Sequence, residues 1–374
     1  MIYLDYASTT PLCKPAKEAM MQAMDVWGNP SSLHSQGRKA KVQLELSRRK
    51  IASLLEVLPA EINFTSGATE SANWVFYMAR KSGIKTVITS PIEHKATLEA
   101  IQHFTVGDNH VKYTHPKPDG NYNLQHIEEL LASAEKPVLV ALLWINNELG
   151  NITRISEISK ICRTYDALLY IDGAQAIGKY QADFHQADFI AGSAHKFYGP
   201  KGTGFLFVNR RMQKKYPFIA GGGQERSLRG GTESTILVPG MAAALEYSMS
   251  QCSDMLRRFE HLSIQLMEHL QPLNVICNGP DVRSDYRYPG IVNISIPQEP
   301  DTGRLLFALD MAEVAVSAGS ACNSGSLKPS HVISYLYPER AKAAHVRVSM
   351  GIDTTSEELR QFADILGRLI QYHN

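Results

Sequence analysis

The feature that most constrains the fold is a regular alternation of strand-like and helix-like segments that begins near residue 38. The run 138-VLVALLWI-145 is apolar throughout, which is typical of a strand buried on both faces. Residues 38–57 carry apolar side chains at helical spacing, and the strand-like stretch 61-EINFT-65 follows them. Further strands are expected at 85–89, 168–172, 188–193 and 203–208, with helices after 66-SGATES-71, within 90–100 and at 155–165. The alternation predicts an α/β fold with a mostly parallel central sheet covered on both faces.

After about residue 237 the pattern changes. A long helix, expected at roughly 238–270, leads to short strands that no longer alternate with helices, and a helix at 355–372 closes the chain. These strands are expected at 274–278, 290–296, 313–318 and 345–350. We interpret this part as a smaller α+β domain that also takes in the N-terminal residues. The predicted large domain is 15–250, and the predicted small domain combines 1–14 with 251–374.

Composition excludes several classes of function. The 374 residues carry a formal net charge of +1, with acidic and basic residues mixed along the chain, so no basic stripe for nucleic acid is expected. The longest apolar run is far too short to span a membrane. The N-terminus MIYLDYASTT resembles no export signal, and we expect a cytoplasmic protein. The five cysteines are scattered without a CxxC pair, which predicts neither a disulfide framework nor a metal site.

Polar side chains follow the expected strands of the first domain at the point where each strand ends. The segment 66-SGATES-71 opens a helix, and its free N–H groups with the Ser66 and Thr69 hydroxyls suit an anion, although a simple helix cap explains it equally well. The other strand ends carry Glu93 and His94; Asn146, Asn147 and Glu148; Asp172 and Gln175; and Ser193, His195 and Lys196. Each residue alone has a structural explanation as a cap or a turn. Because the carboxyl ends of parallel strands meet at one edge, the set together indicates a ligand site.

Three ligands were compared with this set. A nicotinamide dinucleotide requires GxGxxG after the first strand, and SGATES does not match it. A nucleoside triphosphate requires a P-loop before a helix, whereas GPKGTG precedes a strand. Pyridoxal 5'-phosphate fits better, because Lys196 offers a Schiff-base amine, Asp172 a carboxylate for the ring nitrogen, and SGAT with Ser193 a phosphate cradle.

Ten motifs in order resemble the NifS/IscS-like cysteine desulfurases of the class-V aminotransferase family. They are YLDYASTTP, GNPSSLHSQG, FTSGATES, EHKA, NNELG, DGAQAIGK, GSAHKFYGPKGTGFL, GGGQERSLRGGT, SAGSACNSGS and VRVSMG. The resemblance runs nearly end to end. It implies the type I fold of transferases that depend on pyridoxal phosphate. It also implies conversion of L-cysteine to L-alanine, with the sulfur passing first to a cysteine persulfide and then to an acceptor.

The resemblance also implies roles for individual residues. Lys196 carries the cofactor as a Schiff base, Asp172 holds the ring nitrogen, Gln175 holds the ring hydroxyl, and His94 stacks on the ring and transfers protons. The remaining implied ligands are Ala68, Thr69, Ser193 and His195 for the phosphate, Thr232 for the phosphate of the other subunit, and Asn147 and Arg347 for the substrate carboxylate. Because Thr232 is expected to reach the other subunit, the site is expected to need a homodimer. No metal is implied.

The resemblance makes Cys322, in 317-SAGSACNSGSLKP-329, the nucleophile that receives the sulfur. A loop rich in glycine and serine is expected to be mobile, which suits a sulfur carrier. A free cysteine titrates near ~8.5 and only its thiolate attacks, so a partly activated thiol is expected, with His94 as proton partner. Cys13 is interpreted as structural.

Partners and alternatives follow from the same resemblance. The expected sulfur acceptor is an iron–sulfur scaffold or a tRNA-thiolation enzyme, and the C-terminus at Asn374, soon after the last expected helix, weighs against the scaffold. The segment between Gly178 and Ser193 is a few residues shorter than in housekeeping members. A related lyase or aminotransferase, for example one acting on selenocysteine, is the alternative enzyme. A binding protein that kept the fold without catalysis is the non-enzymatic alternative, and it would lack the yellow colour of a Schiff base.

Overall fold

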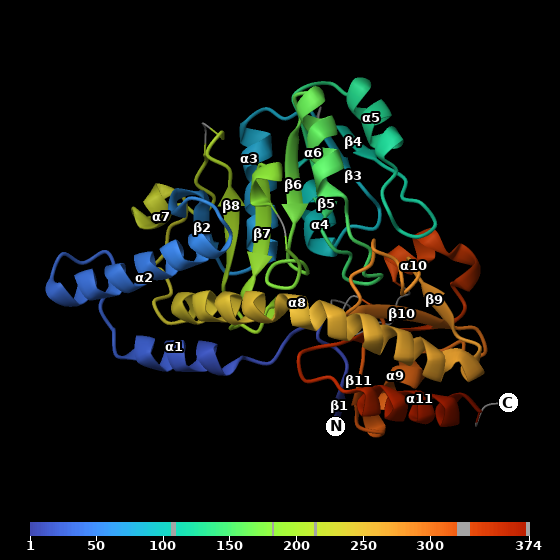
Figure 1. The fold of residues 1–374 in the computed structure, drawn as a ribbon. Coiled ribbons are helices and arrows are strands. Elements are labelled where there is room, and N and C mark those ends of the chain that lie inside the picture. The colour runs from blue at the N-terminus through green and yellow to red at the C-terminus, as the bar shows by residue number, and fades with distance from the viewer. Residues whose placement is uncertain (106–109, 182, 213–214, 320–329, 372–374) are drawn as a thin grey trace.

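The computed structural model describes residues 1–105, 110–181, 183–212, 215–319 and 330–371 (Figure 1). Its centre is a seven-stranded sheet with the strand order β2-β8-β7-β6-β5-β3-β4. The strands are β2 Ile62–Thr65, β3 Thr86–Thr89, β4 His110–Tyr113, β5 Val138–Leu143, β6 Leu168–Asp172, β7 Phe189–Ser193 and β8 Gly204–Val208. All neighbouring pairs are parallel except the two that β8 makes, because β8 runs against both β2 and β7. The predicted α/β class with a mostly parallel central sheet is confirmed.

Helices cover both faces of this sheet, and the alternation along β5 explains why. Val138, Val140 and Leu142 belong to one apolar cluster, whereas Leu139 and Ala141 belong to the other. The helices α3 Ala68–Lys81 and α4 Lys95–Phe104 pack on the second cluster. The first cluster is covered by α2 Ser35–Leu54, α5 Leu124–Ala132, α6 Ile155–Thr164 and α8 Leu237–Leu270. The sheet is therefore the middle of three layers, and its strand ends are the free edges at which a site can form.

The C-terminal part forms a second, smaller sheet. Its order is β12-β10-β9, all antiparallel, with β9 Ile276–Asn278, β10 Ile291–Ile296 and β12 Ala344–Ser349. The helices of this part are α9 Thr302–Met311, α10 His331–Leu336 and α11 Ser356–Gln371. The helix α8 runs from the central sheet to this part, so one long helix joins the two sheets (Figure 1). None of the described helices is long and apolar enough to cross a membrane.

The N-terminal residues lie against the C-terminal part of the chain. Strand β1 (Ile2–Tyr3) pairs in parallel with β11 (Val314–Ala315), and Asp5 bridges to Ser349 at the end of β12. The chain then enters α1 Lys14–Met24, which with α2 extends beyond the sheet as an arm (Figure 1). The segment between β1 and α1 is thereby held next to the ends of the central strands, where it takes part in the site.

Candidate active site

A cavity of about 490 Å³ lies at the carboxyl ends of the central strands. Its walls come from the N-terminal segment, the start of α3, the start of α4, and the segments that follow β5, β6 and β7. The residues predicted from the sequence that line it are Ala68, Thr69, His94, Asn147, Asp172, Gln175, Ser193, His195, Lys196 and Arg347. The structure therefore brings ten of the predicted residues to one cavity.

Lys196 ends a short 3-10 turn, Ala194–Lys196, directly after β7. Its amine nitrogen Nζ donates to the backbone oxygens of Ala7 at 2.7 Å and of Ser8 at 2.8 Å. Both acceptors are neutral carbonyls from the N-terminal segment. These two contacts hold the amine inside the cavity through neutral carbonyls. In this position the amine can reach a bound molecule.

The start of α3 forms one wall of the cavity and is suited to an anion. Its cap position is Gly67, which has no side chain that could accept hydrogen bonds from the first turn, so these N–H groups remain available to a ligand. The backbone of Gly67 has φ +155°, and a Cβ added there would lie 3.3 Å from the Ser193 hydroxyl. Glycine therefore allows the helix start and Ser193 to lie close together, and both line the cavity.

Asp172 and His94 also line the cavity. Asp172, the last residue of β6, is 3% exposed, and its Oδ1 accepts from the Ala174 N–H at 3.0 Å. His94 caps α4, because its Nδ1 accepts from the Ala96 N–H at 3.1 Å. This bond leaves the proton of a neutral imidazole on Nε2. Burial lowers the pKa of His94, and the nearby Asp172 carboxylate opposes that shift. His94 is thus a neutral ring that presents an N–H donor at Nε2.

His195 and Gln175 complete the floor of the cavity. The Nδ1 of His195 lies 3.2 Å from the Thr9 hydroxyl, and burial, together with the positive charge of Lys196, lowers its pKa to about 4. Gln175 donates from Nε2 to the Ala7 oxygen at 2.8 Å. Because Lys196 donates to the same oxygen, Ala7 connects the two side chains.

Arg347 lies in β12 and reaches the cavity from the small sheet. It is 2% exposed and donates to the Asn147 backbone oxygen at 2.8 Å, to Asp5 Oδ1 at 2.9 Å and to the Ser8 hydroxyl at 2.7 Å. Its Nε is buried without a hydrogen-bond partner among the described residues. The three bonds use one N–H of Nη1 and both of Nη2, which leaves the N–H of Nε and the second N–H of Nη1 to bind a planar carboxylate.

Two predicted residues remain, and they differ in what the structure describes. Thr232 is exposed and is not among the residues that line the cavity. Cys322 lies outside the described residues, in 320–329. The described residues on either side of that segment both contact Glu148. The Oε2 of Glu148 accepts from the Ser330 hydroxyl, and a Cβ added at Gly319 would lie 2.4 Å from it.

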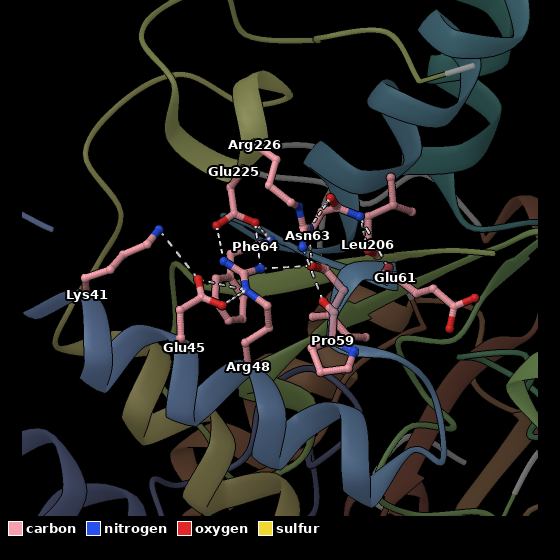
Figure 2. A network of polar contacts seen from close by, with 11 residues as sticks. Lys41, Glu45, Arg48, Pro59, Glu61, Asn63, Phe64, Leu206, Glu225 and Arg226 are labelled. Carbon is pink, nitrogen blue, oxygen red and sulfur yellow. Dashed lines mark hydrogen bonds and ion pairs between the residues drawn. The ribbon is translucent and has the colours of Figure 1, made fainter. Parts of the chain in front are cut away.

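The segment before Thr232 is held by a buried ion pair. Arg48 of α2 binds Glu225 with Nη1–Oε2 at 2.9 Å and Nη2–Oε1 at 2.6 Å, and the Phe64 N–H donates to Glu225 at 2.8 Å (Figure 2). Glu225, Arg226 and Ser227 all have φ between +44° and +65°. Such left-handed residues cost roughly 1–2 kcal/mol each, so the contacts in Figure 2 offset a strained backbone.

The sequence prediction gives no individual role to two buried residues, although it includes one of them, Glu148, among the polar side chains at the strand ends. Lys179 is buried beside Gln175, and Glu148 is buried between residues 319 and 330. Glu148 could be noticed in the sequence because it comes soon after a predicted strand, but no motif assigned it a role. Lys179 stands at the end of the motif DGAQAIGK, which the resemblance explained only through its aspartate and glutamine. Among the described residues, no group of three or more His, Cys, Asp or Glu could hold a metal ion.

Comparison with known proteins adds to this geometry. The family model "Aminotransferase class-V" matches residues 2–362. A protein of Dictyoglomus turgidum named cysteine desulfurase IscS is 36% identical over 381 aligned positions, which cover 99% of this chain and 94% of that protein. A solved structure of a NifS-like protein has a TM-score of 0.90 at 30% identity and covers 99% of both chains. The structure of SspA in complex with cysteine has a TM-score of 0.79 at 30% identity and covers 94% of this chain and 99% of that one.

Proposed function

The chain belongs to the aminotransferase class-V family, and we propose that it is a cysteine desulfurase that converts L-cysteine to L-alanine and passes the sulfur to an acceptor. The observation that carries this is the single cavity at the strand ends, in which Lys196, Asp172, His94 and Arg347 meet. Relatives named cysteine desulfurase align over 98–99% of the chain, and a similar structure holds cysteine.

The residues present fit pyridoxal 5'-phosphate as the cofactor. The start of α3, with Ala68 and Thr69, and the Ser193 hydroxyl form a cradle that a Cβ at Gly67 would narrow, and it suits the phosphate. Asp172 uses Oδ1 for a backbone contact, which leaves Oδ2 for the ring nitrogen. Gln175 suits the ring hydroxyl, and Lys196 the aldehyde carbon. When bound, the cofactor serves as an electron sink for the bonds that break at the substrate.

The protein's own groups position the substrate and move its protons. Arg347, through Nε and with Asn147 beside it, binds the carboxylate of L-cysteine. The amine of Lys196, released from its two carbonyl contacts, takes up the proton of the substrate α-carbon. His94 is neutral because burial lowers its pKa, and it can take up the proton of a thiol once Nδ1 releases its hydrogen bond from the Ala96 N–H.

Sulfur transfer is assigned to Cys322. Its thiolate attacks the substrate sulfur, a bond forms between Sγ and that sulfur, and the bond between the substrate sulfur and Cβ breaks. The carbon takes the electron pair, gains a proton and leaves as the methyl group of alanine. Cys322 then carries the persulfide that an acceptor protein, either an iron–sulfur scaffold or a tRNA-thiolation enzyme, receives.

We propose that the protein forms a homodimer and that the arm formed by α1 and α2 is part of the interface (Figure 1). Large apolar side chains of the arm and its connecting segment are exposed, which is unusual for the surface of a monomer. They are Met21, Met24, Trp27, Leu33, Val42 and Leu46. A second copy of the chain would cover them, and Thr232, exposed here, would then reach the phosphate of the other subunit. The division into a large domain, 15–250, and a small domain, 1–14 with 251–374, stays a prediction from the sequence, and so does a cytoplasmic location.

The experiment that tests the activity measures alanine and sulfide from L-cysteine in the presence of a thiol. Wild-type protein is expected to be yellow and to release both products in equal amounts. Lys196→Ala should lose the colour and the turnover. A yellow wild-type protein that forms pyruvate and ammonia instead of alanine would favour a lyase, and a colourless one after cofactor addition would favour a binding protein.

A further inference from the structure

Lys179 is a buried lysine that the chemistry described above does not use. It lies in the turn that follows β6 and is 6% exposed. Lysine is seldom buried to this extent unless its amine has a partner. The described partner is Gln175, whose Oε1 accepts from the Lys179 Nζ at 3.3 Å.

The groups around Lys179 are positive. Lys196 and Arg347 face it, and its own charge acts on His195. Burial and then these two cations lower the pKa of Lys179 to about 7. A chain that only needed to fill this space would lose nothing by placing an apolar residue here, so the amine requires an explanation through what it contacts.

The contact of Lys179 determines how the Gln175 amide is oriented. A lysine amine in its charged form is a donor only, so it must face the oxygen of the amide rather than its nitrogen. The Nε2 of Gln175 then points away from Lys179 and donates to the Ala7 oxygen at 2.8 Å. That oxygen also accepts from Lys196 Nζ at 2.7 Å, so Lys179, Gln175, Ala7 and Lys196 form one connected row.

We propose that Lys179 is a positioning residue that fixes the Gln175 amide with its N–H groups toward the cavity, where they bind the ring oxygen of the cofactor. The inference rests on the proposed function, because it assigns Gln175 to that oxygen. Nε2 has two hydrogens, and Ala7 uses one of them. The second hydrogen is available to the ionised hydroxyl of the cofactor ring. If the amide were rotated, its own oxygen would face this hydroxyl and repel it. When Lys179 is protonated, its positive charge also lies near the ring oxygen, on the far side of the Gln175 amide.

The experiment separates the donor of Lys179 from its charge. Lys179→Met removes both, whereas Lys179→Gln keeps an N–H donor and removes the charge. The dissociation constant of pyridoxal 5'-phosphate is measured by titrating cofactor-free protein and following the quenching of tryptophan fluorescence. The pH midpoint of the yellow absorbance is measured on the loaded protein. Lys160→Met, a change at an exposed lysine of α6, is the matched control, and circular dichroism of the cofactor-free variants checks their folding.

Lys179→Met is expected to weaken cofactor binding about fivefold, the effect of losing roughly one hydrogen bond. Lys179→Gln should weaken it less than Lys179→Met does. Both should raise the midpoint of the yellow absorbance by on the order of one pH unit, because a nearby positive charge no longer opposes protonation. In a Gln175→Leu background, Lys179→Met should have a smaller effect on the dissociation constant than it has in the presence of Gln175.

Two results would overturn the inference. One is an unchanged dissociation constant and midpoint in Lys179→Met. The other is a loss of affinity that is the same with and without Gln175, which would mean that Lys179 acts on the fold and not through the amide. Both leave the proposed function intact if the wild-type protein binds the cofactor and turns yellow. A wild-type protein that binds no pyridoxal 5'-phosphate contradicts the proposed function and this inference together.

Discussion

Replacing Glu225 tests whether the strained segment is held by its ion pair with Arg48 (Figure 2). The two side chains are 1% and 3% exposed, so neither charge can turn to water when its partner is removed, although Arg48 keeps a second carboxylate, Glu45, at 3.3 Å from its Nε. Removing one partner of a buried pair costs about 3–5 kcal/mol in the free energy of unfolding. For 374 residues, an unfolding entropy of about 0.8 kcal/mol per kelvin converts this loss into a Tm that is about 4–6 °C lower in Glu225→Met.

The assay is thermal unfolding of cofactor-free protein followed by circular dichroism, with Arg48→Met and the double variant measured beside Glu225→Met. Arg48→Met should lower Tm at least as much as Glu225→Met, because Arg48 still has Glu45 as a partner when Glu225 is removed. The double variant should lose less than the sum, by about 1–3 kcal/mol, since it leaves no unpaired charge. Part of the loss should remain, because the Phe64 N–H would still lack the acceptor that Glu225 provides.

Glu357→Gln provides the matched control. Its Oε1 lies 2.6 Å from Arg360 Nη2, the same separation as in the buried pair, but the two side chains are 57% and 51% exposed. Water and salt screen such a pair, so Tm should stay unchanged. Additive losses in the double variant, or a Tm of Glu225→Met equal to that of the control, would refute the view that this ion pair stabilises the left-handed segment.

Three further outcomes are expected. Arg347→Lys should raise KM for L-cysteine more than it lowers kcat, because a lysine cannot bind the carboxylate in a planar way; an unchanged KM in steady-state assays would remove Arg347 from substrate binding. Burial raises the pKa of Glu93 well above 4.5, so the folded state holds a proton there that the unfolded state releases, and stability falls as pH rises above about 4.5; Glu93→Gln should remove that part of the decline in urea unfolding measured from pH 5 to 8, and an identical slope would contradict it. Trp27→Asp should shift the protein toward a monomer in analytical ultracentrifugation, and a dimer of unchanged affinity would exclude the arm as the interface.

The central strands were predictable because their signal is strong. The apolar run at 137–145 contains β5 Val138–Leu143, which is buried along its whole length. The edge strand β4 was missed, since HVKY is partly exposed and mixes apolar with polar residues. The strand expected at 313–318 is only β11 Val314–Ala315, because its partner β1 is two residues long and offers no further pairing.

The site was predictable where it follows from the order of the strands. Asp172, His94 and Lys196 each come directly after a strand, and parallel strands place such residues at one edge. Contacts between distant segments carry no such signal. Arg48 and Glu225 are 177 positions apart, and Arg48 has the appearance of an ordinary charged residue on a helix. The hydrogen bond between Lys179 and Gln175 was not predicted, because both residues lie in a turn that has no periodic pattern.

The most direct test of the account is the intact mass of the purified protein after treatment with L-cysteine in the absence of a reductant, with Cys322→Ala measured beside it. A cysteine desulfurase that uses Cys322 should gain the mass of one sulfur atom in the wild-type protein and none in the variant. A yellow wild-type protein that gains no sulfur would contradict persulfide formation. The same gain in both proteins would contradict the assignment of the sulfur to Cys322.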